Sequence, residues 1–222
     1  AGVGGKYSME GKRLTSYAME ELECPKCGHK HSLKKYKVIN VTEKAKLKEE
    51  IMKNRLYQFS CEECEYMAPL TYDSLYVDSR RNIMIYMAPV MNAEIKAEIA
   101  ELEQEKGIDN INDLKEKIMI VDNHLDDRVI EIIKIMYLDQ IKKEMEDDTL
   151  LNILFDYNRD NYCFLVFFQK KGIGKIPLTR EFYRQVEDKY KEAIKEHSTD
   201  GFMKIDMEWA GKILFKNHNK FN

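Results

Sequence analysis

Short runs of β-branched and aromatic residues recur through the first 90 residues of the chain. Such runs, bounded by polar turn residues, are typical of strands. Strands are expected at 35–41, 56–59, 70–77 and 82–87. Residues 43–54 are polar, with Leu47, Ile51 and Met52 on one side, which predicts a helix between the first two strands. Residues 78–81, Asp-Ser-Arg-Arg, predict the turn between the last two.

The middle of the chain changes to the period of a helix. Apolar residues recur three or four positions apart over 95–102, within a Glu-rich segment for which Gly107 is the expected C-terminal cap. The same spacing over 111–118 predicts a short helix. A longer apolar stripe over 129–141 predicts a third, strongly amphipathic helix.

The last third of the chain combines strands with helices. Residues 151–157 and 162–169 are expected to form an antiparallel hairpin around the turn residues 158–161. The second run is apolar on both faces, so it is expected to be the interior strand of a small sheet. Thr179 is the expected N-cap of an aromatic-rich helix, and a last short helix is expected at 206–215.

Four of the five cysteines form two pairs with the spacing C-x-x-C: Cys24 with Cys27, and Cys61 with Cys64. Two intervening residues let a tight turn point both sulfurs at one ion, and two such pairs supply the four thiolates of a tetrahedral zinc site. Because four thiolates would close the coordination sphere, the zinc is predicted to be structural rather than catalytic. We refer to the two C-x-x-C turns as knuckles.

The two knuckles differ in their turn residues. In the first, Pro25 fixes φ and Gly28 can take the positive φ that reverses the chain. In the second, Glu62 and Glu65 occupy the corresponding places, so this turn must be made with less suitable residues. The 33 residues between the knuckles exceed the usual spacing of a minimal ribbon and predict an insertion, which the helix at 43–54 supplies.

Other uses of these cysteines fit the sequence less well. A redox C-x-x-C normally occurs singly at the start of a helix. Five cysteines in 222 residues and such short spacings argue against disulfides and for a reducing compartment. His29 and His31 are near enough to be substitute ligands, but they are expected at the surface beside the site. Cys163 lies in an apolar run and is expected to be buried in a strand.

Charge is distributed unevenly. Residues 24–87 carry 12 Lys and Arg against 8 Asp and Glu, whereas residues 88–150 carry 8 against 17. The basic excess suggests an alternative function, in which a nucleic acid binds the face of residues 26–55. The lysines expected to contact phosphates are Lys34, Lys35, Lys37, Lys46 and Lys48. A solvated face, or docking against an acidic segment of this chain or a second copy, explains the same charges.

Evidence for an enzyme is weak. Asp126 and Asp127 could be a catalytic carboxylate pair, but stabilisation of the N-terminus of the helix over 129–141 explains them more simply. No histidine lies in a motif with acid and nucleophile partners. No apolar run approaches the roughly 20 residues of a membrane helix, and a cytoplasmic protein is expected.

Three segments together resemble one known family. They are Cys24-Pro25-Lys26-Cys27-Gly28, Cys61-Glu62-Glu63-Cys64, and Leu125-Asp126-Asp127-Arg128-Val129-Ile130-Glu131, and together they look like the CpXC family of bacterial and archaeal proteins. The resemblance covers about residues 22–145 and departs at the second knuckle, which lacks the proline. It implies a zinc-ribbon domain in a prokaryotic cytoplasm, and it implies neither an activity nor catalytic residues.

The sequence therefore predicts an α+β protein. Its expected parts are a disordered start or tag remnant at 1–20, a zinc ribbon with an inserted helix at 21–90, a helical extension at 91–146, and a small antiparallel sheet with flanking helices at 147–222. The expected function is a protein-interaction or adaptor module with a structural Zn²⁺ held by the four paired cysteines. An unidentified protein is the expected partner, with nucleic acid and a second copy of the chain left open.

Overall fold

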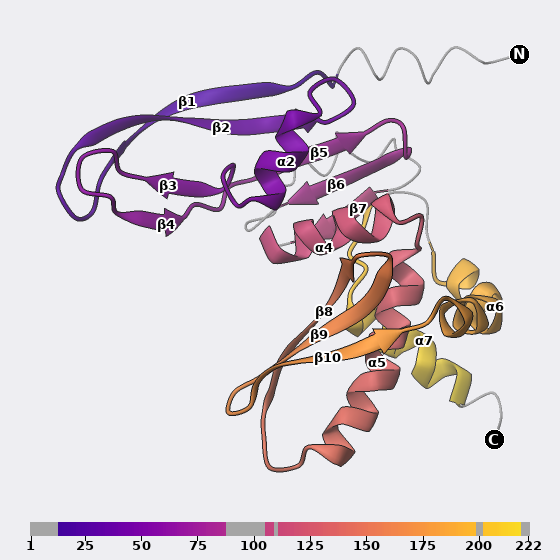
Figure 1. The fold of residues 1–222 in the computed structure, drawn as a ribbon. Helices are drawn as coiled ribbons and strands as arrows, with labels where there is room; N and C mark the ends of the chain where they lie inside the picture. The colour runs from indigo at the N-terminus through magenta and orange to yellow at the C-terminus, as the bar shows by residue number, and fades with distance from the viewer. Residues whose placement is uncertain (1–12, 88–104, 109–110, 199–201, 219–222) are drawn as a thin grey trace, which may run out of the picture. The chain divides into compact units, whose positions relative to one another are not determined.

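The computed structural model describes residues 13–87, 105–108, 111–198 and 202–218. The chain divides into two compact units (Figure 1). The first unit contains residues 1–115 and 200–203, and the second contains residues 116–199 and 204–222. The main boundary lies at 115/116, within helix α4, whereas the sequence pattern predicts one at 146/147. Among the described residues, no helix combines the length and the hydropathy needed to cross a lipid bilayer.

A mixed sheet organises the first unit. Its strands are β1 (Ser16–Glu23), β2 (Lys30–Asn40), β5 (Ser74–Asp78), β6 (Ile83–Met87), β7 (Glu105–Ile108) and β11 (Phe202–Met203), hydrogen-bonded in that order. The pairs β1–β2 and β5–β6 are antiparallel hairpins, while β2–β5, β6–β7 and β7–β11 are parallel. Every residue of β5 and β6 is buried, which explains their continuous apolar sequences.

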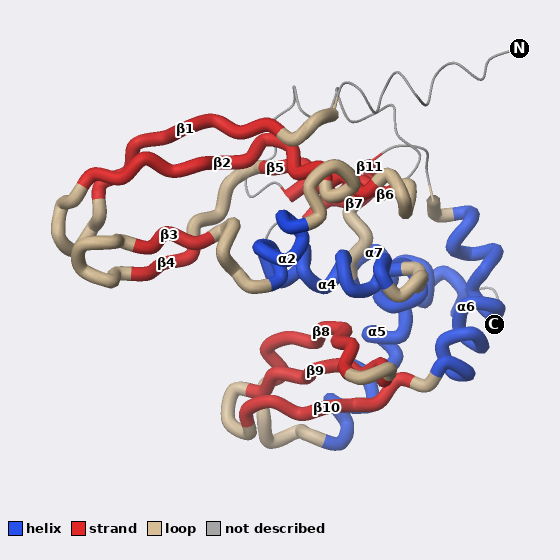
Figure 2. Tube along the Cα trace, turned by 45° about the horizontal axis from the view of Figure 1, so that its top comes forward, coloured by secondary structure: helices blue, strands red, loops and turns tan. Residues whose placement is uncertain are grey.

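A second, smaller hairpin carries the other cysteine pair. It consists of β3 (Gln58–Ser60) and β4 (Met67–Pro69), and it lies alongside the β1–β2 hairpin (Figure 1, Figure 2). Helix α2 (Lys46–Met52) connects β2 to β3 and buries Leu47 and Ile51. The inserted helix expected at 43–54 is therefore present, with tighter bounds.

Several details of the first unit differ from the sequence expectations. Strand β1 begins at Ser16, so residues 16–20 of the expected disordered start form a strand. Nearly every side chain of β1 is exposed, so it has no buried alternation to predict it, and its conformation comes from pairing with β2. The expected helix over 95–102 lies outside the described residues. Gly107 lies within strand β7 rather than at a helix end.

The second unit combines helices with a three-stranded antiparallel sheet of order β10-β9-β8. Its strands are β8 (Leu150–Asn158), β9 (Asn161–Phe168) and β10 (Gly172–Leu178), and its helices are the end of α4 (Ile111–Asp122), α5 (Asp127–Glu144), α6 (Arg180–Glu196) and α7 (Met207–His218). Strand β9 is central, as predicted. Helix α5 packs against α6, α7 and β8, so it belongs with the C-terminal sheet rather than to a separate helical extension.

Turns and caps in this unit follow the local sequence. Arg159 and Asp160 both take positive φ, 48° and 65°, as a two-residue hairpin turn requires. The Thr179 hydroxyl accepts a hydrogen bond from the Phe182 N–H at 3.1 Å, which confirms the predicted N-cap of α6. Cys163 lies in β9 but on its half-exposed face, so the prediction of a buried cysteine was wrong.

Candidate metal centre

The first knuckle is closed by two backbone hydrogen bonds. The N–H of Cys24 donates to the carbonyl of His29 at 2.8 Å, and the N–H of Gly28 donates back to the carbonyl of Cys24 at 2.9 Å. Gly28 has φ of 76°, the left-handed conformation that only glycine adopts without strain. This turn therefore joins β1 to β2 with the sulfurs of its two cysteines directed to one side.

The second knuckle repeats this pattern. The N–H of Cys61 donates to the carbonyl of Tyr66 at 2.8 Å, and the N–H of Glu65 donates to the carbonyl of Cys61 at 3.1 Å. Glu65 stands where Gly28 stands in the first knuckle and takes φ of 59°. A β-carbon in this region is disfavoured, so the second turn forms at a cost that the first avoids.

The four sulfurs of the knuckles converge. Sγ of Cys24 lies 3.6 Å from Sγ of Cys64, and Sγ of Cys27 lies 3.6 Å from Sγ of Cys61. All four ligand atoms lie within 4.8 Å of one another. Sulfurs at about 2.3 Å from a tetrahedral metal are separated by about 3.8 Å, so the spacing suits one ion. A disulfide bond needs about 2 Å, and all four cysteines are free thiols.

Each short sulfur contact joins one hairpin to the other. An ion held by these four sulfurs would therefore tie the β1–β2 turn to the β3–β4 turn. Apolar side chains surround it: Phe59 is buried, and Leu22, Leu33, Tyr66 and Leu70 pack around the same cluster. This cluster is small, so a bound ion would be a major part of what holds the two hairpins together.

His31 contacts the cage without belonging to the set of four ligands. Its Nε2 lies 3.2 Å from Sγ of Cys61, within reach for an N–H to sulfur hydrogen bond. The His31 ring packs edge-on against Phe59 at 5.3 Å and against His29 at 4.7 Å. A hydrogen bond to a ligating sulfur orients that sulfur and lowers its charge, so His31 is well placed to support a metal thiolate.

The thiols also affect one another's protonation. Burial opposes ionisation of Cys24, but backbone N–H groups of Cys27 and Lys26 and two neighbouring thiols lower its pKa to about 6. A backbone N–H favours the thiolate of Cys27, yet burial and the other thiols outweigh it and raise the pKa of Cys27 to about 12. One thiolate therefore forms readily and later ones do not, so a divalent cation that binds all four must displace protons.

The structure disperses the lysines of β2 that the sequence analysis proposes for phosphate contact. Lys34 lies on one face of β2, with its Nζ 4.6 Å from the centre of the Tyr17 ring. Lys35 lies on the opposite face because side chains alternate along a strand, whereas Lys37 is exposed at a shift in the β1–β2 register, where this alternation is interrupted. Lys35 is bound to Glu20, at 2.7 Å between Nζ and Oε2.

The two lysines of α2 do not complete a common surface either. Lys46 is exposed, whereas Lys48 is partly buried with its Nζ 3.5 Å from Oδ2 of Asp78. Lys34 and Lys35 lie on opposite faces of β2, and Lys35 and Lys48 each contact a carboxylate, so the five lysines do not share one free basic face.

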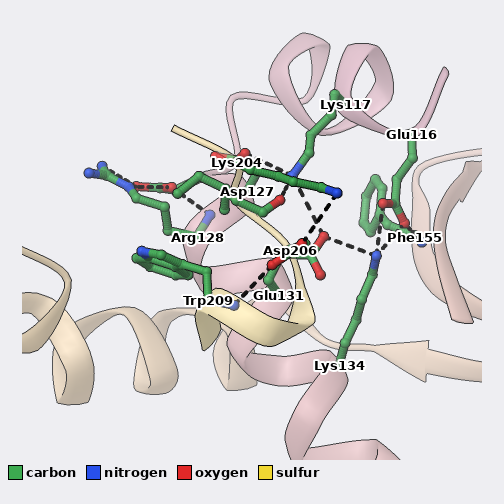
Figure 3. Close-up of polar contacts among 12 residues, drawn as sticks. Glu116, Lys117, Asp127, Arg128, Glu131, Lys134, Phe155, Lys204, Asp206 and Trp209 are labelled. Carbon is green, nitrogen blue, oxygen red and sulfur yellow. Dashed lines mark hydrogen bonds and ion pairs between the residues drawn. The ribbon is translucent and has the colours of Figure 1, made fainter. Parts of the chain in front are cut away.

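A second group of functional interest is a buried charge cluster in the second unit, which sequence reasoning missed (Figure 3). Its members, all at most 3% exposed, are Glu116, Lys117, Asp127, Glu131 and Lys134. Lys117 lies 2.9 Å from Asp127 and 3.6 Å from Glu131, and Lys134 lies 2.8 Å from Glu116 and 3.1 Å from Glu131. Glu131 thus lies between the two ammonium groups, as Figure 3 shows.

Backbone groups complete the buried charge cluster. Oε2 of Glu116 accepts a hydrogen bond from the N–H of Phe155 at 2.5 Å, and Nζ of Lys117 donates to the carbonyl of Ile205 at 2.7 Å. The carboxyl of Asp126, in contrast, caps α5 by accepting from the Arg128 N–H at 2.9 Å. Capping therefore accounts for Asp126, as predicted, while its neighbour in the sequence belongs to the cluster. The available signal was the presence of charged residues among the isoleucines of α4 and α5.

The comparisons with known proteins agree with the cysteine geometry. No curated protein and no solved structure matches the chain significantly. The family described as CpXC protein matches residues 22–134. This range begins two residues before Cys24, includes both knuckles, and ends at Lys134 of the buried charge cluster. Since the match extends over half of the 222 residues, the chain belongs to the CpXC family.

Proposed function

We propose that this protein is a zinc-stabilised protein-interaction module. Cys24, Cys27, Cys61 and Cys64 hold a structural Zn²⁺, and the β1–β2 hairpin presents the binding surface. Four thiolates at tetrahedral spacing are the donor set of structural zinc sites, and they leave no open position for a substrate. Free thiols at this spacing also suit the reducing environment of the cytoplasm.

The exposed outer strand is the observation that carries the proposal. Among the described residues, β1 is hydrogen-bonded to β2 alone, so its other edge is available for a further strand. Tyr17 is 48% exposed and Met19 is 54% exposed, on one face of this strand. Tyr36 packs edge-on against Tyr17 at 5.8 Å and extends the apolar surface onto β2. Large apolar side chains beside a strand edge suit an extended peptide that adds to the sheet.

The metal and the surface are linked through the hairpin. The first knuckle is the turn between β1 and β2, so the ion fixes the end of the strand pair that carries Tyr17 and Met19. A hairpin in isolation is marginally stable, and a structural zinc site contributes on the order of 10 kcal/mol of apparent free energy to folding. Removal of the metal is therefore expected to weaken partner binding without touching the contact residues.

Metal analysis together with site-specific cross-linking tests this function. Anaerobically purified protein is expected to contain one zinc ion per chain, and the Cys61→Ser variant far less. A photo-reactive amino acid at Met19 is expected to give a defined cross-linked protein in the cell. The same group at Phe215, which is 76% exposed in the second unit, should not. The cross-linked partner, once purified, should bind the wild type and not the Met19→Lys variant.

Several results would contradict the proposal. Purified protein without zinc would refute the proposed metal site. Identical cross-linked products from positions 19 and 215 would refute the proposed binding surface on β1. Cross-links only to a second copy would make β1 a self-association surface. The alternative, nucleic-acid binding by the face of residues 26–55, predicts oligonucleotide affinity with a steep salt dependence. The dispersed lysines do not favour this alternative, and the same purified protein can be titrated to test it.

A further inference from the structure

The three-stranded sheet of the second unit has an inner face and an outer face. On the inner face Phe155 and Phe164 are buried, and Tyr137 of α5 packs edge-on against Phe164 with 5.5 Å between ring centres. Helix α5 therefore packs on this face. The outer face is formed by the alternate residues of the same strands, whose side chains point the opposite way.

Nine residues in register make up the outer face. Three from the central strand β9 pair with three of β8 and three of β10, and these rows are Asn152-Phe167-Ile173, Leu154-Leu165-Lys175 and Asp156-Cys163-Pro177. Six of the nine are apolar, and Ile173 is 65% exposed. The solvated face of an antiparallel sheet is normally polar, so this composition suits a face that packs against another surface.

The outer face carries one charge at each edge. Asp156 lies on β8 and Lys175 on β10, with β9 between them. Neither side chain forms an ion pair with another described residue. Burial raises the pKa of the Cys163 thiol on β9, Asp156 adds to this rise and Lys175 opposes it, so both charges act on the same central sulfur. The face therefore has an apolar centre between an anionic and a cationic edge.

We propose that this outer face is the interface of a homodimer, in which a second copy packs face to face about a two-fold axis parallel to β9. An axis in this direction exchanges the two edges, so β10 of each copy lies over β8 of the other. Lys175 is then displaced by two residues along the strand, about 7 Å, from Asp156 of the second copy. The flexible four-carbon stem of lysine can span this offset. The apolar residues of both β9 strands meet in the middle, as in a β-sandwich.

The positions of the charges favour this occupant and this orientation. A two-fold axis perpendicular to the strands would place β10 over β10, and the two Lys175 side chains would then face each other as like charges. The parallel axis brings each lysine towards an aspartate instead. The outer face is therefore complementary to itself in one orientation, which is the requirement of an interface formed by two identical surfaces.

The size of the face sets the expected strength of the dimer. Nine residues are fewer than the roughly 20–30 residues that each partner contributes to a stable interface of standard size. A weak dimer is therefore expected, with a dissociation constant on the order of micromolar or above.

Sedimentation velocity of the full-length protein between about 1 and about 200 µM measures this equilibrium, because the range begins near the expected dissociation constant. Ile173→Lys should weaken dimerisation at least about tenfold, since it brings one charge from each copy into an apolar interface. The residue is exposed in the single copy, so the fold should persist. Phe215→Lys and Met19→Lys are matched controls at exposed apolar positions outside the face, and both should leave dimerisation unchanged.

A charge exchange tests the orientation. Lys175→Glu replaces both attractive contacts of the dimer by repulsive ones and should weaken dimerisation about tenfold, because two exposed ion pairs contribute a few-fold each. The double variant Lys175→Glu/Asp156→Lys exchanges the two edges and should restore the wild-type dissociation constant. Far-ultraviolet circular dichroism equal to that of the wild type confirms that each variant is folded.

Three results would overturn the proposal. A monomer over the whole concentration range would show that the outer face is not a homodimer interface. A dimer weakened by Met19→Lys and not by Ile173→Lys would place self-association on β1. A dimer weakened by Ile173→Lys but unaffected by Lys175→Glu, or not restored by the double variant, would exclude the axis parallel to β9.

Discussion

Lys134 offers a direct test of the energetic role of the buried charge cluster. Its ammonium group contacts Glu116 at 2.8 Å and Glu131 at 3.1 Å, and only 3% of the residue is exposed. The cluster contains three carboxylates and two ammonium groups, so Lys134→Met leaves three carboxylates with Lys117 alone. Removing one partner of a buried ion pair costs about 3–5 kcal/mol, because the remaining charge is left unpaired in a low-dielectric interior. That cost is a large part of the roughly 5–15 kcal/mol that holds a typical domain folded.

Two further variants isolate the cause of this loss. Lys143→Met makes the same change in the same helix at a side chain that is 79% exposed and 3.9 Å from Asp139, so a cost below about 0.5 kcal/mol is expected. The double variant Lys134→Met/Glu116→Gln removes one charge of each sign and returns the cluster to its original excess of one carboxylate. It should recover more than half of the stability lost by Lys134→Met.

Urea unfolding followed by tryptophan fluorescence measures these differences. Trp209 is the single tryptophan of the chain, is 8% exposed, and lies in the second unit with the cluster. Its signal therefore reports on the unit that contains the substitutions. If Lys134→Met costs no more than Lys143→Met, or if Glu116→Gln adds to the loss instead of relieving it, the electrostatic explanation is wrong.

Three other outcomes follow from the geometry. Glu65→Gly should stabilise the two cysteine-bearing hairpins by about 1 kcal/mol, because the φ of 59° at this position favours glycine. Gly28→Ala should destabilise them by a similar amount, because Gly28 has a φ of 76°. Thermal unfolding of the zinc-loaded protein measures both changes. Chelation should abolish the amide dispersion of residues 24–87 and leave Trp209 fluorescence unchanged, and simultaneous loss of both signals would refute independent units. Desolvation raises the pKa of Glu116 above its ordinary 4.5. Its protonated form therefore stabilises the fold below that pH, and this contribution is lost as pH rises through the folded-state pKa. The free energy of unfolding of the wild type, measured relative to that of Glu116→Gln, should fall as pH rises, and a constant difference between pH 4 and pH 8 would contradict this expectation.

Features set by local sequence were predictable from the chain alone. The two C-x-x-C spacings identify the four cysteines that the structure brings together in a geometry able to hold a metal ion, because each knuckle is a turn of a few residues. Thr179 and Asp126 identify helix starts for the same reason. Strand β1 was not predictable, since its residues bury almost nothing and depend on pairing with β2. The unit boundary differs from the predicted one because of the helix that follows Asp126. Its sequence reveals an apolar stripe but not the elements that cover this stripe, which are α6, α7 and β8.

The buried charge cluster shows where such reasoning stops. Glu116 and Lys134 are 18 positions apart, on two helices, and each resembles a solvent-facing residue when its own helix is considered alone. Their pairing at 2.8 Å depends on how α4 and α5 pack, which is a property of the folded unit. The knuckles are also 33 residues apart, but a structural zinc site needs four ligands, which the four cysteines can supply together. Their chemistry therefore predicts that the two knuckles meet, although they are distant in the sequence. Lysine and glutamate occur on most surfaces and carry no such requirement. A candidate metal site can therefore be identified from the residue types of its ligands. A buried ion pair can be identified only when the folded structure shows that both partners are buried.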